Sequence, residues 1–110
     1  MLKIPPIDDA ALKALVAKNP DAEIIEDDSI GLYAVVRPPA RLEWKTYRTE
    51  SVEPAVRYTA QMKVCTTIAL YPEPADLLAL FDRRPAAVET MFGQVAELAG
   101  ISDRVTRRKP

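Results

Sequence analysis

Cys65 is the strongest candidate nucleophile in this chain, because a thiolate reacts readily near neutral pH. It is the single cysteine among 110 residues, and the sequence contains no histidine. A lone cysteine without histidine cannot form a Cys/His pair, a Ser/His/Asp triad or any of the usual structural zinc sites. Cysteine catalysis therefore has no partner residue in this sequence.

The acidic run at residues 26–29, EDDS, could in principle hold a hard cation. It lacks the spaced ligands, central glycine and distal glutamate of an EF-hand loop, so we interpret it as a solvated turn. Three glycines in all provide neither a phosphate-binding loop nor a dinucleotide fingerprint. We expect no catalytic residue, no metal ligand and no cofactor, and hence a protein that is not an enzyme.

The composition, with 48% hydrophobic and 28% charged residues, is typical of one soluble globular domain. A net charge of -1 gives no general attraction to nucleic acid or to an anionic membrane. Residues 104–110 are different, because they carry four bases and no acid: Arg104, Arg107, Arg108 and Lys109. We expect a single domain over residues 1–100, followed by a basic, flexible tail over residues 101–110.

The first sixteen residues do not resemble a signal peptide, since two prolines and two aspartates interrupt their apolar character. No stretch of about 18 apolar residues could span a bilayer, and one cysteine excludes an intramolecular disulfide. These observations predict a cytoplasmic protein without a membrane partner.

The elements that would position any functional residue begin with a short helix and a hairpin. Asp8 can cap a helix, with Ile7 and Leu12 as its hydrophobic staple, and Asn19-Pro20 ends it. Apolar residues then flank the polar turn at 26–29, and two prolines at 38–39 end the second run. This pattern predicts a β-hairpin in the N-terminal half.

Four helices are expected after the hairpin. The first runs through ARLEWKTYR, with Pro39 in its first turn. The second starts near residue 51 or 53 and continues to Pro72, with a stripe at Ala55, Tyr58, Met62, Cys65 and Ala69. Residues 64–68 have a strand-like composition, so we leave an extended end open there. Residues 73–84 and 85–100 form the last two helices, and Gly100 closes the chain's clearest apolar stripe. The fold class is thus α+β and mostly α-helical.

Two pairs of apolar residues are candidates for partner contact. Trp44 and Tyr47 lie three residues apart on one helix face, and Leu80 and Phe81 belong to a helix that is apolar on more than half its circumference. Core packing is the competing interpretation for both pairs. Cys65 lies on an apolar stripe, where we expect a buried, unreactive thiol.

The order of these segments resembles the tail assembly chaperones of tailed bacteriophages. The resemblance covers roughly residues 10–100: the LKALVAKNP helix, the hairpin EIIEDDSIGLYAVVRPP, the proline-led segment RPPARLEWKTYR and the ending YPEPADLLALFDRRPAAVETMFGQVAELAG. Members of the family share a tyrosine-proline step, a leucine-rich helix, an RRP-like break and a last helix closed by glycine.

The resemblance implies a non-enzymatic chaperone that binds the tape measure protein in the host cytoplasm and aids assembly of the tail tube. The partner would be the tape measure or a tail tube protein, and no nucleic acid is expected. The alternatives are a structural or adaptor protein retained in a phage-like particle and, less favoured, a nucleic-acid-binding protein acting through the basic tail. Whether the chain forms a homo-oligomer stays open.

Overall fold

The computed structural model describes residues 3–101 and 106–110. Within these residues five α-helices accompany a small three-stranded antiparallel sheet, which confirms the predicted α+β class and the hairpin in the N-terminal half. The elements in chain order are α1 (Asp9–Lys18), β1 (Glu23–Asp27), the 3-10 helix η1 (Asp28–Ile30), β2 (Leu32–Val36), α2 (Arg41–Glu50), α3 (Pro54–Ile68), β3 (Ala69–Tyr71), α4 (Pro74–Arg83) and α5 (Ala87–Leu98).

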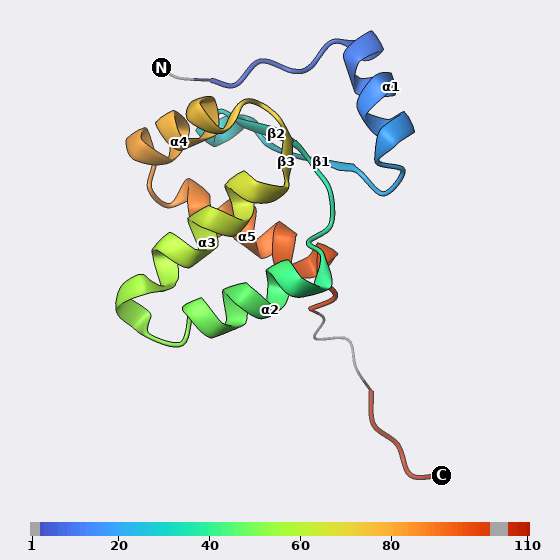
Figure 1. Ribbon diagram of the computed structural model, residues 1–110, viewed down its shortest axis with the longest axis vertical. Helices are drawn as coiled ribbons and strands as arrows, with labels where there is room; N and C mark the ends of the chain where they lie inside the picture. The colour runs from blue at the N-terminus through green and yellow to red at the C-terminus, as the bar shows by residue number, and fades with distance from the viewer. Residues whose placement is uncertain (1–2, 102–105) are drawn as a thin grey trace.

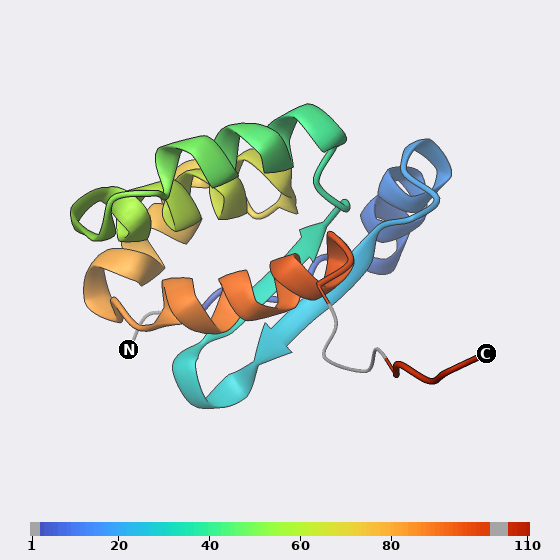
Figure 2. The same cartoon turned by 90° about the horizontal axis from the view of Figure 1, so that it is seen from below.

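The helices α2 to α5 pack together, and α3 contacts the other three. Figure 1 places α3 and α5 between the sheet and α2, and Figure 2 shows α5 between them, whereas α1 stands at the edge of the molecule in both views, apart from this group. The segment before α1 is tied to the sheet region, because the Ile4 amide donates to the Gly31 carbonyl at 3.0 Å and the Tyr71 hydroxyl donates to the Pro5 carbonyl. Helix α1 itself has no buried residue.

The hairpin follows directly from its turn chemistry. β1 and β2 pair antiparallel from Glu23↔Val36 to Asp27↔Leu32. The Asp27 carboxylate accepts a hydrogen bond from the Ser29 amide at 3.0 Å, and Gly31 adopts φ 73°, a left-handed conformation that favours glycine. The acidic run at 26–29 therefore contributes to the strand end and the turn.

The third strand was not predicted from the sequence. α3 ends at Ile68 rather than continuing to Pro72, and β3 then pairs with β2 through Val35↔Tyr71. A strand of three residues is too short to show an alternating pattern, and its pairing partner is far away in the chain. Residues 64–68, left open as an extended end, are helical instead.

The apolar stripe expected on α3 is also corrected. The buried residues of this helix are Ala60, Val64, Cys65 and Ile68, whereas Tyr58 of the predicted stripe is 36% exposed. The face that packs is rotated because α3 lies between α2, α4 and α5, so a burial pattern from several sides replaces a single stripe.

Helix ends agree with the sequence in most places. Asp8 caps α1, accepting from the amides of Ala10 and Ala11. At the end of α5 the Gly100 amide donates to the Glu97 carbonyl and the Ile101 amide to the Ala96 carbonyl, each at 3.0 Å, with Gly100 at φ 102°. This is the Schellman ending that the sequence predicts.

The start of α2 differs from its prediction. Pro39 lies outside the helix, because the extended residue Ala40 is the N-cap and Arg41 is the first helical residue. The carboxylate of Glu43, the third helical residue, accepts from the Ala40 amide at 2.8 Å, which is the half of a capping box that does not need a polar N-cap side chain.

The core lies between the sheet and helices α3 to α5. Its largest fully buried side chains are Phe81, Leu32, Ile68, Leu77, Leu80, Met91, Val35, Val36, Val88, Val95 and Cys65. These residues come from β2, α3, α4 and α5, so one apolar cluster joins the sheet to the helices. Nothing in the residues that the structure describes forms a helix long and apolar enough to cross a membrane.

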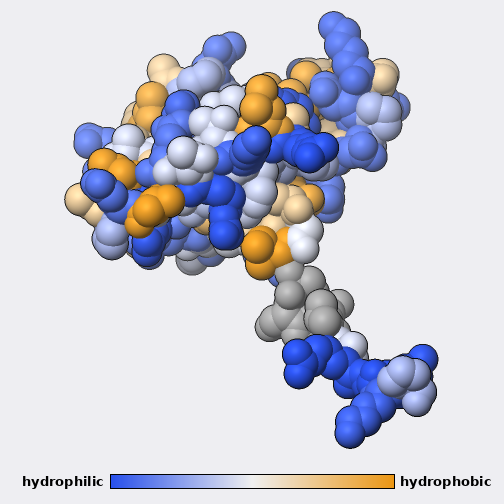
Figure 3. All heavy atoms as spheres, turned by 60° about the horizontal axis from the view of Figure 1, so that its bottom comes forward, coloured by the Kyte–Doolittle hydropathy of each residue, from blue (hydrophilic) through white to orange (hydrophobic). Residues whose placement is uncertain are grey.

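The basic tail contains Arg107, Arg108 and Lys109 within the described segment 106–110, which is exposed and has no helix or strand. Figure 3 shows it as a hydrophilic segment outside the body of the molecule. Arg104 lies outside the described residues.

Gly93, in the middle of α5, offers a test of helix packing. A β-carbon added there would meet no atom within 4 Å, and the residue has no positive φ. We expect Gly93→Ala to raise the free energy of unfolding by about 0.5–1 kcal/mol, because alanine loses less backbone entropy than glycine on entering a helix. Urea denaturation measures this change. Gly100→Ala is the matched control: space is again open, but φ 102° is strained for alanine, so stability should fall by about 1–2 kcal/mol. If Gly93→Ala were less stable than the wild type, Gly93 would not lie at an open position of a regular helix.

Candidate partner-binding groove

An open, mostly apolar groove runs between α2 and α3. It has a volume of about 200 Å³, smaller than the roughly 300–1,000 Å³ of typical small-molecule sites. We call it the α2–α3 groove; its lining residues are Leu42, Glu43, Thr46, Tyr47, Glu50, Ala60, Lys63, Val64, Thr67 and Ile68. Its size suits one or two inserted side chains of a larger partner.

Helix α2 supplies one wall through helical spacing. Leu42, Thr46 and Glu50 are four residues apart and therefore share a face, and Tyr47 is next to that row. Tyr47 is 9% exposed and belongs to the floor, while Leu42 is 72% exposed at the rim. An exposed leucine beside an apolar floor is the part of this groove that gains most from being covered.

Helix α3 supplies the other wall by the same spacing. Ala60, Val64 and Ile68 lie four residues apart and are all buried, so they continue the floor. Lys63 lies on the rim, and its Nζ contacts the Glu50 carboxylate at 2.8 Å. This ion pair joins the two walls, but both side chains are well exposed, so it contributes little to stability.

An aromatic cluster on α2 and α5 holds α2 in position. The ring of Trp44 stacks on Phe92 with centroids 6.0 Å apart and an angle of 9° between planes. Tyr47 contacts both rings, with centroid distances of 5.1 Å to Trp44 and 4.7 Å to Phe92. Such pairs add about 0.5–1.5 kcal/mol each beyond their buried area, so this cluster fixes the floor residue Tyr47.

An ion pair anchors the start of α2. The two guanidinium nitrogens Nη1 and Nη2 of Arg37 each donate to one carboxylate oxygen of Glu43, both at 2.7 Å. The hydrogen bonds from Arg37 lower the pKa of Glu43 to about 2, against the opposing effect of burial, with the Ala40 amide assisting. This pair was not predicted from the sequence, because a non-helical proline segment separates Arg37 from Glu43.

The four predicted contact residues lie in different places. Tyr47 lines the α2–α3 groove, and Trp44 is half-buried against Phe92. Leu80 and Phe81 are 0% and 2% exposed and belong to the core, so this structure does not present them as a contact surface. The sequence left open whether this face of the helix packs in the core or contacts a partner. The structure places both residues in the core.

The large apolar residue that α4 does expose is Leu78, at 43%. It lines a shallow hollow between α3 and α4 together with Tyr58, Met62, Phe81, Asp82 and Pro85. The Tyr58 hydroxyl donates to the Pro85 carbonyl at 3.1 Å, which closes one side of this hollow.

The groove residues Leu42, Ala60 and Val64 were missed by sequence reasoning. Leu42 stands among charged residues at the start of α2, and the groove exists only because α2 and α3 fold back against each other. Only the spacing of Leu42, Thr46 and Tyr47 on one side of the helix could have indicated a partner-facing row.

Cys65 is fully buried, as predicted, and burial raises the pKa of its thiol to about 12. The neutral thiol packs as a small apolar side chain. Within residues 3–101 and 106–110 no three His, Cys, Asp or Glu side chains come close enough together to hold a metal ion.

The α2–α3 groove is thus a candidate site for contact with a macromolecule, defined by Leu42 at its rim and Tyr47, Ala60, Val64 and Ile68 in its floor. No protein-family model, no curated protein and no solved structure matches this chain.

Proposed function

We propose that this protein is a non-enzymatic assembly chaperone of a tailed bacteriophage, which binds the tape measure protein in the host cytoplasm and aids assembly of the tail tube. The order of sequence segments described above supports the family, and the α2–α3 groove supports the mode of action. The single observation that carries the proposal is the exposed Leu42, 72% accessible, beside an apolar floor.

The client would bind as an amphipathic helix whose apolar residues enter the groove. Grooves between two helices accept such a helix through side chains at spacings of three and four residues. The groove is too small for a sizeable ligand but large enough for an apolar anchor, and its rim offers the Lys63 ammonium and the Glu50 carboxylate for polar contacts. Binding the exposed client lowers the concentration of free chains that can aggregate.

Co-expression with the tape measure protein of the same phage tests the proposal. We expect a larger soluble fraction of the tape measure protein and a complex that copurifies with the chaperone. If the soluble fraction stays the same and no complex forms, the proposal fails.

Leu42→Asp should weaken the complex about tenfold or more, because a charge at the rim would be desolvated by an apolar anchor. Val52→Asp is the matched control, since Val52 is also 72% exposed but does not line the groove. Titration of each purified variant with a client segment measures both affinities. Equal losses in the two variants would place the contact elsewhere.

The alternative function, a structural or adaptor protein of the particle, predicts a different location after assembly. Mass spectrometry of purified particles distinguishes the two: a chaperone is absent from them, whereas a structural protein is retained in fixed copy number.

A further inference from the structure

The outer edge of β1 is a second interaction surface, separate from the α2–α3 groove. The order of the sheet is β1-β2-β3, so β1 pairs on one side only, and among the described residues no backbone group of Glu23–Asp27 bonds to another element on the other side. Figure 2 shows β1 as the outermost strand beside α5. An unpaired edge presents a row of amides and carbonyls that can accept a further strand.

The other edge of the sheet is less suited to this. β3 has three residues, its register with β2 shifts between Val35 and Val36, and Pro72 follows it without an amide hydrogen. β1 has five residues and no proline. Strand addition would therefore occur at β1.

A groove lies along the β1 edge. It has a volume of about 200 Å³ and is bounded by Glu23, Ile24 and Ile25 of β1 and by Gln94, Glu97 and Leu98 of α5. An added strand would lie over the last turns of α5, with Leu98 and Ile25 beneath it. A strand edge next to a helix is the arrangement in which extended peptides bind by strand addition.

The charge of this edge selects the occupant. Glu23, Glu26 and Asp27 of β1 and Glu97 of α5 carry negative charge, and no ion pair involves any of them within the part of the chain that the structure describes. Acidic side chains on an edge oppose pairing with another acidic strand, so β1 does not pair readily with a second β1. They favour a strand that carries bases.

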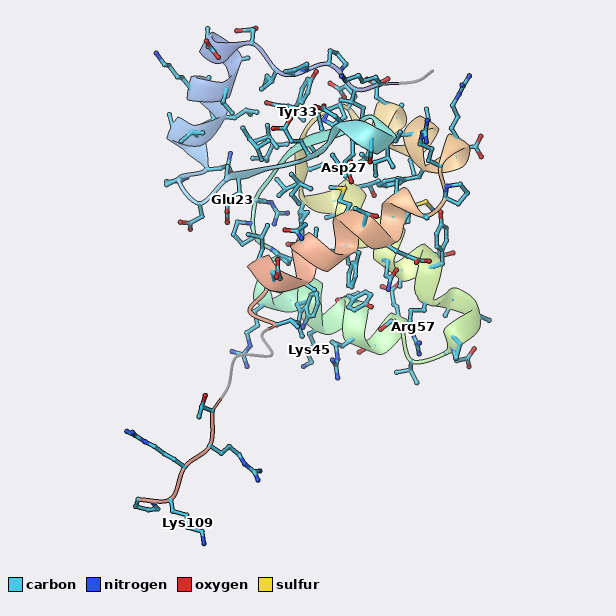
Figure 4. All side chains as sticks on the ribbon, turned by 180° about the vertical axis from the view of Figure 1, so that it is seen from behind. Glu23, Asp27, Tyr33, Lys45, Arg57 and Lys109 are labelled. Atoms are coloured by element: carbon cyan, nitrogen blue, oxygen red, sulfur yellow. The ribbon has the colours of Figure 1, made fainter. Side chains whose placement is uncertain are left out.

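This chain contains such a segment. Residues 106–110, TRRKP, hold three bases and no acid and are exposed. Figure 4 labels Glu23 and Asp27 on β1 and Lys109 far out on the tail, so the tail does not occupy the groove of its own chain. In an extended strand Arg107 and Lys109 point to one face and Arg108 to the other, which matches acids on both faces of β1: Glu23 and Asp27 on one, Glu26 on the other.

We propose that the groove between the outer edge of β1 and α5 binds the basic segment 106–110 of a second copy of this chain, which adds to the sheet as a fourth strand. The tail leaves the body at the end of α5, next to this groove. Two copies related by a two-fold axis can therefore exchange tails reciprocally and form a closed dimer. The proposal does not depend on the proposed chaperone function, because the α2–α3 groove stays free.

Sedimentation equilibrium of the full chain over micromolar to millimolar concentrations tests the proposal. We expect a monomer–dimer equilibrium that weakens about tenfold between low salt and about 0.5 M NaCl, because exposed charges are screened. Deletion of residues 106–110 should abolish dimerisation. Arg83→Glu/Arg84→Glu, at the last residue of α4 and its C-cap, makes the same change of charge as Arg107→Glu/Arg108→Glu, and it should leave the dimer unchanged.

The decisive experiment exchanges the charges of the tail and the groove between two variants. Arg107→Glu/Arg108→Glu gives an acidic tail and an acidic groove, whereas Glu23→Lys/Glu26→Lys/Glu97→Lys leaves Asp27 as the one acid of this edge and gives a basic tail and a basic groove. Each variant alone should be monomeric, and an equimolar mixture should form a heterodimer, since both tails then meet a groove of opposite charge. Failure of the mixture to associate, while both variants are folded, overturns the proposal.

Hydrogen exchange identifies the strand. Amides of residues 23–27 should exchange more slowly in the dimer than in the truncated chain. If the chain is a monomer and residues 23–27 are protected only when the tail is present, the tail binds the groove of its own chain. That result would overturn the proposed swapping of tails between two copies. A full chain that is monomeric at millimolar concentration without this protection, or that dimerises equally well without its tail, also overturns the proposal.

Discussion

Replacing Phe81 with alanine is expected to lower the free energy of unfolding by about 3–5 kcal/mol, the range for a large aromatic residue removed from a core. Phe81 is 2% exposed and lies on α4 with Leu77 and Leu80, which are fully buried. Domains of this size are stable by only about 5–15 kcal/mol, so this loss is a large share of the total and should lower the urea midpoint and the melting temperature of the variant clearly. Urea denaturation followed by circular dichroism measures the change.

Leu78→Ala is the matched control on the same helix. Leu78 is 43% exposed, so its truncation should change stability by no more than about 1 kcal/mol. Comparable losses in both variants would mean that α4 is rotated relative to the structure. A Phe81→Ala variant of normal stability that had lost its client would instead restore Phe81 as a contact residue.

The distinction matters for any functional assay of this helix. A core variant that unfolds also loses binding, and the loss then reports on stability rather than on contact. Leu80 and Phe81 were attractive as contact residues because the helix is apolar on more than half its circumference. Its three buried residues account for the core face, and Leu78 is the large apolar side chain of the helix that stays exposed.

Local signals predicted most of the elements. The Asp8 cap, the polar turn before Gly31 and the glycine ending at Gly100 each act over a few residues, and each occurs where the sequence placed it. Local rules succeed there because the hydrogen bonds that end a helix or close a turn involve near neighbours.

The features that the sequence did not predict are non-local. β3 forms because Ala69–Tyr71 meets β2, some thirty residues earlier in the chain. The floor of the α2–α3 groove combines Tyr47 with Ala60 and Val64 from the next helix. Side-chain types alone do not tell which of several apolar faces packs inward, so the rotation of α3 and the position of the groove depended on tertiary packing.

Glu43→Gln is expected to lower the free energy of unfolding by about 2 kcal/mol at neutral pH. The Glu43 carboxylate accepts both Arg37 hydrogen bonds at 2.7 Å and also the Ala40 amide. Its pKa is lowered from an ordinary 4.5 to about 2, and one unit of pKa corresponds to about 1.4 kcal/mol. The side chains of Arg37 and Glu43 are 31% and 26% exposed, so solvent screening makes the expected loss of stability smaller than the pKa shift alone would give.

The pH dependence gives the sign of this effect. A carboxylate whose pKa is lower in the folded chain stabilises the fold above the unfolded pKa and loses this contribution as pH falls through the folded pKa. The difference between wild type and Glu43→Gln should therefore be constant above about pH 5 and shrink between pH 4.5 and about 2. Urea denaturation at a series of pH values measures it.

Glu89→Gln is the control, because Glu89 is an exposed acid in the first turn of α5. It should change stability by less than about 0.5 kcal/mol. A Glu43→Gln difference that persists unchanged down to pH 2 would show that the glutamine acts through packing rather than through lost charge.

Because Leu42 lies beside Glu43 in the first turn of α2, loosening of this ion pair should also lower client affinity in Glu43→Gln at neutral pH. Retained affinity would mean that the rim of the α2–α3 groove is held by the aromatic cluster alone.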